Sequence, residues 1–273
     1  MDNKKKFEIK NAHKQYITNF RHYLYNINKT DLIISISAQD NNIKLWELNN
    51  YECLLNIQNI RKDMYLYSSC FLNDNNQLYI LTSNFTYSLP EPIKLYNLQG
   101  NIIKEIKESS DKVHFIDTYY DKELSNYYII TGNQGYVKSY NYNKNELYYK
   151  YSDNNHNGHT SIVINDKDII IKLIESSWDK NIRIWDFQSG NLLNKIKIND
   201  ELTGICLWDN DHLYVGCNDK SIKIVDMKNN LIINSILAHD SQITTIKKIC
   251  HPKYGECLLS QGLKEENIKL WFK

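Results

Sequence analysis

Six related segments recur along the chain of 273 residues, and this repeat constrains the fold more than any other feature of the sequence. Each segment is short, and most are rich in isoleucine and leucine. Each has a marker position that is tryptophan in the clearest copies, such as IRIWDF (182–187). Tyrosine or valine replaces the tryptophan in the other copies. The markers are Trp46, Tyr96, Tyr140, Trp185, Val225 and Trp271, with spacings of 50, 44, 45, 40 and 46 residues.

Each repeat contains four short β-rich runs separated by polar turns, and no helical period of 3.6 residues is present. The sequence therefore predicts an all-β fold with the marker in the third strand of each repeat. A four-stranded sheet cannot bury both of its faces alone, but sheets packed side by side can, as in a β-propeller. We expect six four-stranded blades in one domain, 1–273. The expected repeats are 13–60, 61–108, 109–154, 155–199, 200–238 and 239–273.

The fourth repeat carries Gly158-His159, then Asp179, then Trp185-Asp186. From about Phe7 to Lys273 the chain resembles the WD-repeat β-propeller family. In that family a histidine, a turn aspartate, the marker tryptophan and a serine or threonine of the second strand form a buried network. The resemblance implies such networks here, with members His159, Asp179, Trp185, His13, Asp40 and Trp46.

The hydroxyl position of these networks departs from the family pattern. Four residues before the aspartates, this chain has Ile36, Glu175 and Val215. Because none of these side chains is a hydroxyl, we expect the networks to be incomplete.

The last repeat ends after its third strand, so an outer strand is needed to protect the sheet edge. FEIKNAH (7–13) aligns with IINSILAH (232–239), the last strand of the fifth repeat and the histidine that follows it. We therefore expect residues 6–11 to pair with the strand at 268–272 and close the fold. The alternative is a strand donated by a partner protein.

Composition disfavours several classes of function. The net charge is +1 and only three residues are arginine, so neither nucleic acid nor an acidic membrane is an expected partner. No run approaches 18 apolar residues, and none of the six cysteines forms a Cys-x-x-Cys pair. We expect a cytoplasmic protein, with a nuclear location left open.

No motif for catalysis, phosphate binding or metal binding occurs. Glu175, Asp179 and His159 form a possible acid–base group, but the resemblance assigns two of them to a structural network. His156 and His159 have ligand-like spacing without a second pair. We therefore predict a non-enzymatic protein with no cofactor and no metal.

Trp178 precedes the turn aspartate of the fourth repeat, where a large aromatic side chain is typical of a binding hot spot. The same position is Gln39 in the first repeat and Asn218 in the fifth. The competing interpretation is that Trp178 folds over a neighbouring blade. Ten of the 21 tyrosines lie between residues 119 and 151, so Tyr148 and Tyr149 form a second candidate docking site.

These features together predict a scaffold that docks peptides or protein domains on its loop faces, with the propeller monomeric within a complex. A fixed structural subunit of a larger assembly is the first alternative. A propeller enzyme with a site in the central channel is the second. The residues expected near that channel are mostly apolar or small polar, which disfavours an enzyme.

Overall fold

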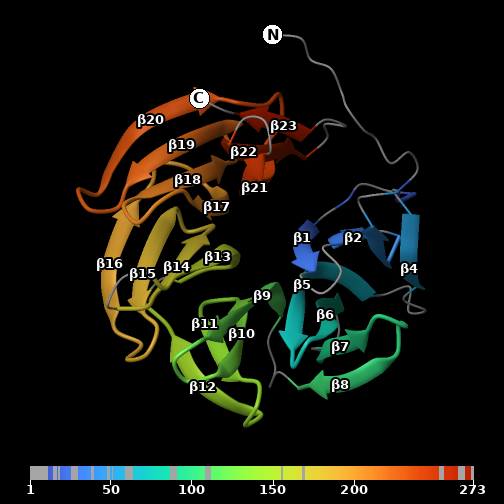
Figure 1. Ribbon diagram of the computed structural model, residues 1–273. Coiled ribbons are helices and arrows are strands. Elements are labelled where there is room, and N and C mark those ends of the chain that lie inside the picture. The colour runs from blue at the N-terminus through green and yellow to red at the C-terminus, as the bar shows by residue number, and fades with distance from the viewer. Residues whose placement is uncertain are drawn as a thin grey trace. The chain divides into compact units, whose positions relative to one another are not determined.

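All regular elements in the described part of the protein are β-strands (Figure 1). The structure, a computed structural model, describes residues 12–14, 17, 19–25, 30–37, 40–47, 50, 52–58, 64–86, 91–107, 112–154, 156–167, 170–251, 255–263 and 268–271. The chain forms two compact units, Met1–Ser110 and Asp111–Lys273. Among the described residues, no helix has the length and apolar character needed to cross a membrane.

The first unit contains two four-stranded antiparallel sheets, each with its strands in chain order. The strands of the first sheet are β1 (Asn19–Tyr25), β2 (Thr30–Ser37), β3 (Asn42–Glu47) and β4 (Glu52–Gln58). The strands of the second are β5 (Met64–Asp74), β6 (Gln77–Thr86), β7 (Ile93–Asn97) and β8 (Ile102–Ile106).

The second unit contains three four-stranded sheets and one described three-stranded sheet, again with the strands in chain order. The third sheet contains β9 (Val113–Asp121), β10 (Asn126–Asn133), β11 (Val137–Asn141) and β12 (Glu146–Tyr151). The fourth contains β13 (His159–Asn165), β14 (Lys172–Ser177), β15 (Asn181–Asp186) and β16 (Leu192–Lys197). The fifth contains β17 (Leu202–Leu207), β18 (His212–Cys217), β19 (Ser221–Asp226) and β20 (Leu231–Leu237). The sixth contains β21 (Ile243–His251), β22 (Gly255–Gly262) and β23 (Ile268–Trp271).

These sheets are the blades of a β-propeller, and the expected all-β class with six blades is confirmed. Each marker residue lies in the third strand of its blade, as the repeat predicts. The expected N-terminal strand, residues 6–11, lies outside the described residues, so its pairing with the last blade stays a prediction.

The apolar cores lie between successive blades of each unit. In the first unit one cluster joins Ile34 and Leu45 of the first blade to Leu66 and Ile80 of the second. In the second unit a cluster joins Ile174 and other residues of the fourth blade to residues of the fifth. Because neighbouring blades within a unit bury apolar faces against one another, a single blade would expose these faces to water.

The turns between third and fourth strands explain the second residue of the Trp-Asp pair. Asp186 accepts hydrogen bonds from the backbone N–H of Gln188 at 2.9 Å and from Ser189 Oγ at 2.6 Å. The hydrogen bond from Ser189 lowers the pKa of Asp186 below its usual range. Asp226 caps the corresponding turn of the fifth blade in the same way. The aspartate after the marker therefore fixes a hairpin.

Gly190 ends the turn after β15 in the left-handed region, with φ of 71°. A side-chain carbon at this position would overlap the ring of Tyr149 on β12 of the neighbouring blade. Glycine is therefore needed for its backbone conformation and for the close approach of the tyrosine.

We predict that Gly190→Ala lowers the free energy of unfolding by about 1–3 kcal/mol more than Gly255→Ala does, because only Gly190 faces a packed ring. Gly255 is the matched control: its φ is 69°, and no heavy atom lies within 4 Å of the added carbon. Urea denaturation of both variants measures the difference. Equal losses would show that backbone strain alone accounts for the effect.

Candidate functional site

Trp178 lies in the turn between β14 and β15, and 43% of its surface is exposed. Its backbone N–H donates to the carbonyl oxygen of Gly158 at 3.0 Å, and its ring covers Gly158 so closely that a side-chain carbon there would overlap it. The ring of His114, on the neighbouring third blade, lies 5.5 Å away in an edge-on arrangement. Trp178 thus covers part of the neighbouring blade and presents the rest of its surface to solvent.

Asn218 is exposed in the equivalent turn of the fifth blade, and its backbone N–H bonds with the carbonyl oxygen of Glu201 at 3.0 Å. Trp178 and Asn218 share one end of their blades, because both turns connect a second strand to a third. Gln39, the third residue predicted for this surface, lies outside the described residues.

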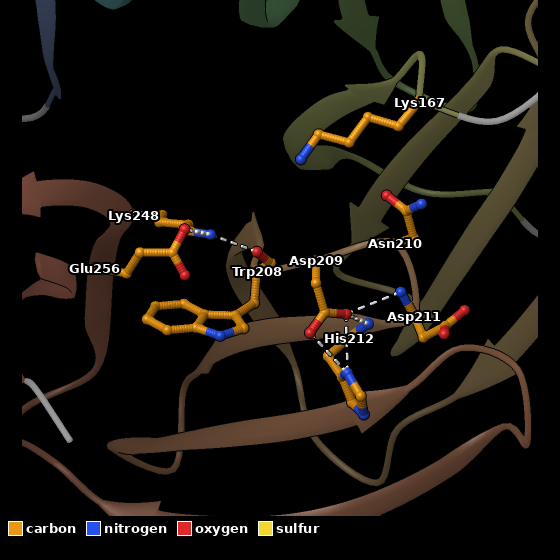
Figure 2. Close-up of a pocket in the computed structure, with 8 residues that line it drawn as sticks. All are labelled: Lys167, Trp208, Asp209, Asn210, Asp211, His212, Lys248 and Glu256. Atoms are coloured by element: carbon orange, nitrogen blue, oxygen red, sulfur yellow. Dashed lines mark hydrogen bonds and ion pairs between the residues drawn. The ribbon is translucent and has the colours of Figure 1, made fainter.

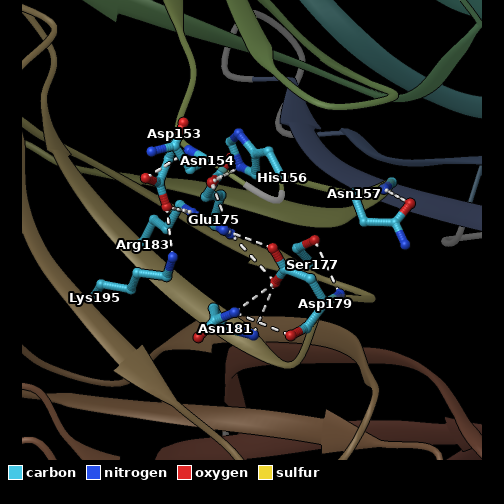
Figure 3. A network of polar contacts seen from close by, with 11 residues as sticks. Asp153, Asn154, His156, Asn157, Glu175, Ser177, Asp179, Asn181, Arg183 and Lys195 are labelled. Atoms are coloured by element: carbon cyan, nitrogen blue, oxygen red, sulfur yellow. Dashed lines mark hydrogen bonds and ion pairs between the residues drawn. The ribbon is translucent and has the colours of Figure 1, made fainter.

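A fully buried arginine, Arg183 on β15, organises a network of polar groups in the fourth blade (Figure 3). Its Nε lies 3.0 Å from Asp153 Oδ2, and its Nη2 lies 2.6 Å from Asp179 Oδ2. Its Nη1 is 3.9 Å from Glu175 Oε1. Asp153 lies in the loop before the fourth blade and Asp179 in the turn that carries Trp178, so one guanidinium joins loop, turn and strand.

The ionised state of this cluster follows from its contacts. Burial would raise the pKa of Asp153, but hydrogen bonds from Lys195 and Arg183 outweigh burial and lower it to about 2. For Asp179, too, burial acts upward, while Arg183 and Asn181 lower the pKa below its usual range. Both carboxylates are therefore charged at neutral pH, which a buried guanidinium requires.

Glu175 occupies the second strand of this blade and is fully buried. Its Oε1 lies 2.5 Å from His156 Nε2, in the loop before the blade. His156, rather than the predicted His159, is thus the histidine observed beside this carboxylate. The side chain of His159 lies outside the described residues.

Among the described residues, Trp185 makes no contact of the kind that the resemblance implies. Its indole Nε1 is buried and has no hydrogen-bond partner among the described residues. The reason lies one strand away, where Leu173 pairs with Trp185 and Glu175 stands two residues further on. The family places a hydroxyl there, whereas here Glu175 contacts His156 and Arg183 instead.

The first blade contains a complete network. This corrects the expectation that the network would be incomplete because Ile36, and not a serine or threonine, stands four residues before Asp40. His13 Nδ1 lies 3.1 Å from Asp40 Oδ2, and His13 Nε2 lies 2.8 Å from Ser35 Oγ. Trp46 Nε1 donates to the same Ser35 oxygen at 2.8 Å. Burial lowers the pKa of His13 despite the opposing attraction of Asp40, so the ring is mainly neutral at pH 7. A neutral ring donates from Nδ1 to the carboxylate and accepts from the serine hydroxyl.

The sixth blade repeats part of this arrangement. His239 Nε2 lies 2.7 Å from Ser260 Oγ, and Trp271 Nε1 donates to the same oxygen at 2.8 Å. The register explains the match, because Ile33 pairs with Trp46 and Leu258 pairs with Trp271, so each serine stands two residues beyond the marker's partner. Two blades thus contain the His–Ser–Trp contacts of the family.

Comparisons with known proteins agree with these contacts. No family model matches the chain. It is 30% identical over 74 residues to the U3 small nucleolar RNA-associated protein 21 homolog of Schizosaccharomyces pombe, and 30% identical over 78 residues to myosin heavy chain kinase C of Dictyostelium discoideum. It is 26% identical over 103 residues to the ribosome biogenesis protein WDR12 homolog of Culex quinquefasciatus.

These matches cover 27%, 29% and 36% of the chain, and only 8%, 10% and 24% of the respective relatives. They coincide with six repeats, a blade fold, and His–Ser–Trp contacts at the expected register. The chain is therefore similar to WD-repeat β-propeller proteins in its repeats, its fold and these contacts.

A regular feature of the repeats distinguishes the position of Arg183 in the sequence. Two residues before each marker the chain has a basic residue. These residues are Lys44, Lys94, Lys138, Arg183, Lys223 and Lys269. Lys223 Nζ lies 2.5 Å from Asp219 Oδ2, and Lys269 Nζ donates to the carbonyl oxygen of Ala238 at 2.7 Å. A cation at this position therefore holds the turn or the preceding loop in several blades.

Tyr148 and Tyr149 are half-buried and pack against the core between the third and fourth blades. The ring of Tyr148 lies 4.8 Å from that of Tyr128 and 5.7 Å from that of Phe187. Tyr149 covers Gly190. Much of the surface of both rings serves contacts between blades, and their role in docking a partner stays a prediction.

A polar depression of 440 Å³ lies at the opposite end of the blades of the second unit, beside the turn between β17 and β18 (Figure 2). Lys248 Nζ lies 4.8 Å from the centre of the Trp208 ring and 2.6 Å from Glu256 Oε1. His212 Nδ1 lies 2.8 Å from Asp209 Oδ1. The charged groups in these contacts pair with one another along the lining of the depression.

Asp200, Cys217 and Asp219 place three potential ligand atoms within 4.8 Å of one another. Lys223 Nζ lies 2.5 Å from Asp219 and 3.9 Å from Asp200, so an ammonium group already supplies the positive charge. Burial raises the pKa of Cys217 to about 12, which keeps it a thiol rather than the thiolate that a metal binds. The cluster is therefore a partly exposed ion pair, in which Lys223 lies beside the two carboxylates.

We predict that Asp153→Asn makes stability less dependent on pH between 4 and 2. A carboxylate whose pKa falls to about 2 on folding stabilises the fold above its ordinary value of 3.8, and this contribution is lost as the pH falls toward 2. Urea denaturation at pH 5, 4 and 3 should show the wild type losing about 1 kcal/mol more than the variant over this range. Asp211→Asn, an exposed control, should behave like the wild type. If stability fell with pH to the same extent in Asp153→Asn and in the wild type, the lowered pKa of Asp153 would be contradicted.

Proposed function

We propose that this protein is a scaffold that docks a peptide or loop of a partner protein against Trp178. WD-repeat propellers typically bind other proteins, and the observation that supports this surface is one exposed tryptophan on a firmly held turn. Tryptophan is enriched in binding hot spots because it contributes a large contact area with little loss of side-chain freedom.

The surroundings of Trp178 support docking without a large rearrangement. The turn is fixed by the bond to Gly158, and the Asp179 carboxylate beside it is fixed by Arg183. The exposed part of the ring is therefore held in one position before a partner arrives. Pre-organisation of this kind reduces the entropy lost on binding. Asn218 provides an exposed amide at the same end of the blades for polar contacts.

A second candidate function is a fixed subunit of a larger assembly. Two relatives are named for U3 small nucleolar RNA or for ribosome biogenesis, which favours an assembly role and a nuclear location over the cytoplasmic one expected from composition. In such an assembly RNA would lie near the protein, although the net charge of +1 provides no general attraction for it. The relative named as a kinase is covered by this chain over 10% of its length, and we propose no enzymatic activity.

We predict that Trp178→Ala removes one or more partners from those recovered with the wild type by affinity purification. The lost contact area of a hot-spot tryptophan corresponds to about 2 kcal/mol or more, or at least about thirtyfold in affinity. Tyr120→Ala is a matched control, because Tyr120 is 40% exposed and lies near a turn at the other end of the third blade. Thermal unfolding of both variants separates loss of binding from loss of fold.

Identical partner sets for the wild type and Trp178→Ala would remove Trp178 from the docking surface. Equal losses in both variants would point to a general loss of folded protein. Recovery of a stable complex whose composition does not change in Trp178→Ala would favour the fixed-subunit alternative.

A further inference from the structure

The outer strand of the fifth blade, β20, is an exposed and uncharged sheet edge. Its sequence is LIINSIL, and no residue in it carries a charge. Side chains on both faces of the strand are exposed, with Leu231 at 58%, Ile233 at 53% and Leu237 at 75%. Because β20 pairs only with β19, the backbone groups on its other side face outward. Exposed apolar edges of this kind favour pairing with another strand.

The outer strands of the other four-stranded blades carry charges that β20 lacks. Each has an exposed aliphatic residue near its start, such as Ile103 on β8, which is 54% exposed. The charged residues on these strands are Glu52, Lys104, Glu105, Glu146, Lys150, Lys195 and Lys197. Charged side chains on an edge strand oppose edge-to-edge association. The fifth blade is therefore the one four-stranded blade of the described structure without this protection on its outer strand.

The β20 sequence is nearly symmetric about Asn234. In an antiparallel pair of two copies centred there, Leu231 faces Leu237 and Ile232 faces Ile236. Ile233 then faces Ser235, and Asn234 faces its own copy. Apolar residues directly opposite one another stabilise a sheet, and a two-fold pair uses the same surface on both copies. We propose that β20 is a homodimerisation edge at which two copies of this chain pair their β20 strands antiparallel, in place of the monomer expected from the sequence.

The same test applied to the other outer strands gives poorer matches. An antiparallel pair of β8 places Lys104 opposite its own copy, which is destabilising. Pairing β16 places Leu192 opposite Lys197 and Asn194 opposite Lys195. Compared with β8 and β16, β20 is therefore better suited to pair with its own copy, because it has no charged residue and its residue order is nearly symmetric.

Two local features have to change in the dimer. The register of β20 against β19 shifts between Ile232 and Asn234, and a regular pair of the two copies requires this irregularity to straighten. The backbone N–H of Ser235 donates to Asn234 Oδ1 at 2.8 Å, so the strand covers one donor with its own side chain. A seven-residue strand spans roughly 23 Å, and pairing along one strand buries less surface than the ~1,600 Å² of a standard interface. The dimer should thus be weak and depend on protein concentration.

Sedimentation velocity of the purified full chain from 1 to 100 µM tests the association, with a concentration-dependent dimer as the expected result. Ile233→Lys should raise the dissociation constant at least about tenfold, because it places an unpaired ammonium group in the paired edge. Ile103→Lys is the matched control, since Ile103 has nearly the same exposure on β8, and it should leave the dimer unchanged.

Cross-linking tests the register. In a Cys53→Ser background, which removes an exposed thiol, Asn234→Cys should form a disulfide-linked dimer under mild oxidation. Asn194→Cys should not, although Asn194 on β16 pairs with Ile184 on β15 as Asn234 on β20 pairs with Ile224 on β19. A monomer at every concentration, a dimer unaffected by Ile233→Lys, assembly beyond a dimer, or equal cross-linking at both positions would overturn the proposal.

Discussion

The arrangement of the fourth blade depends on one buried cation. Arg183 has no exposed surface, and its guanidinium contacts Asp153 from the loop before the blade and Asp179 from the turn between β14 and β15. A buried guanidinium is stable only when charged groups pair with it and hydrogen bonds satisfy its donors. The loop and the turn are therefore held together, and the backbone bond from Trp178 to Gly158 fixes the tryptophan above them.

The basic residue two positions before each marker makes different contacts in different blades. Lys44 and Lys269 bond with the backbone of the preceding loop, whereas Lys223 pairs with the turn aspartate of its own blade. Arginine can reach several carboxylates at once through its planar group, which a lysine ammonium does less well. The fourth blade has thus exchanged the His–Ser–Trp contacts of the first blade for a network of charges, and this blade also carries the exposed tryptophan.

The sequence predicted the strand order and the position of each marker, because the spacing of 40–50 residues and the alternation of strands and turns are local features. It misplaced the hydroxyl of the first blade because the turn after Ser37 is one residue longer than the turn after Ser177, which moves Ser35 into register. It missed the contacts of Arg183 and His156, because their partners come from a loop and a strand that only folding brings together. The unprotected edge of β20 likewise depends on which strand lies outermost, and on side-chain exposure that a repeat pattern does not reveal.

A double-mutant cycle between Arg183→Met and Asp179→Asn, measured by urea denaturation at pH 7, tests most directly whether the buried cation holds the turn that carries Trp178. Arg183→Met leaves several carboxylates without their guanidinium, and Asp179→Asn removes the shortest of its ion pairs. We therefore expect each single variant to lose about 3 kcal/mol or more. We expect the pair to show a coupling free energy of about 2 kcal/mol or more. Losses that add to within about 0.5 kcal/mol would contradict this dependence, because they would show that the turn is held without the ion pair.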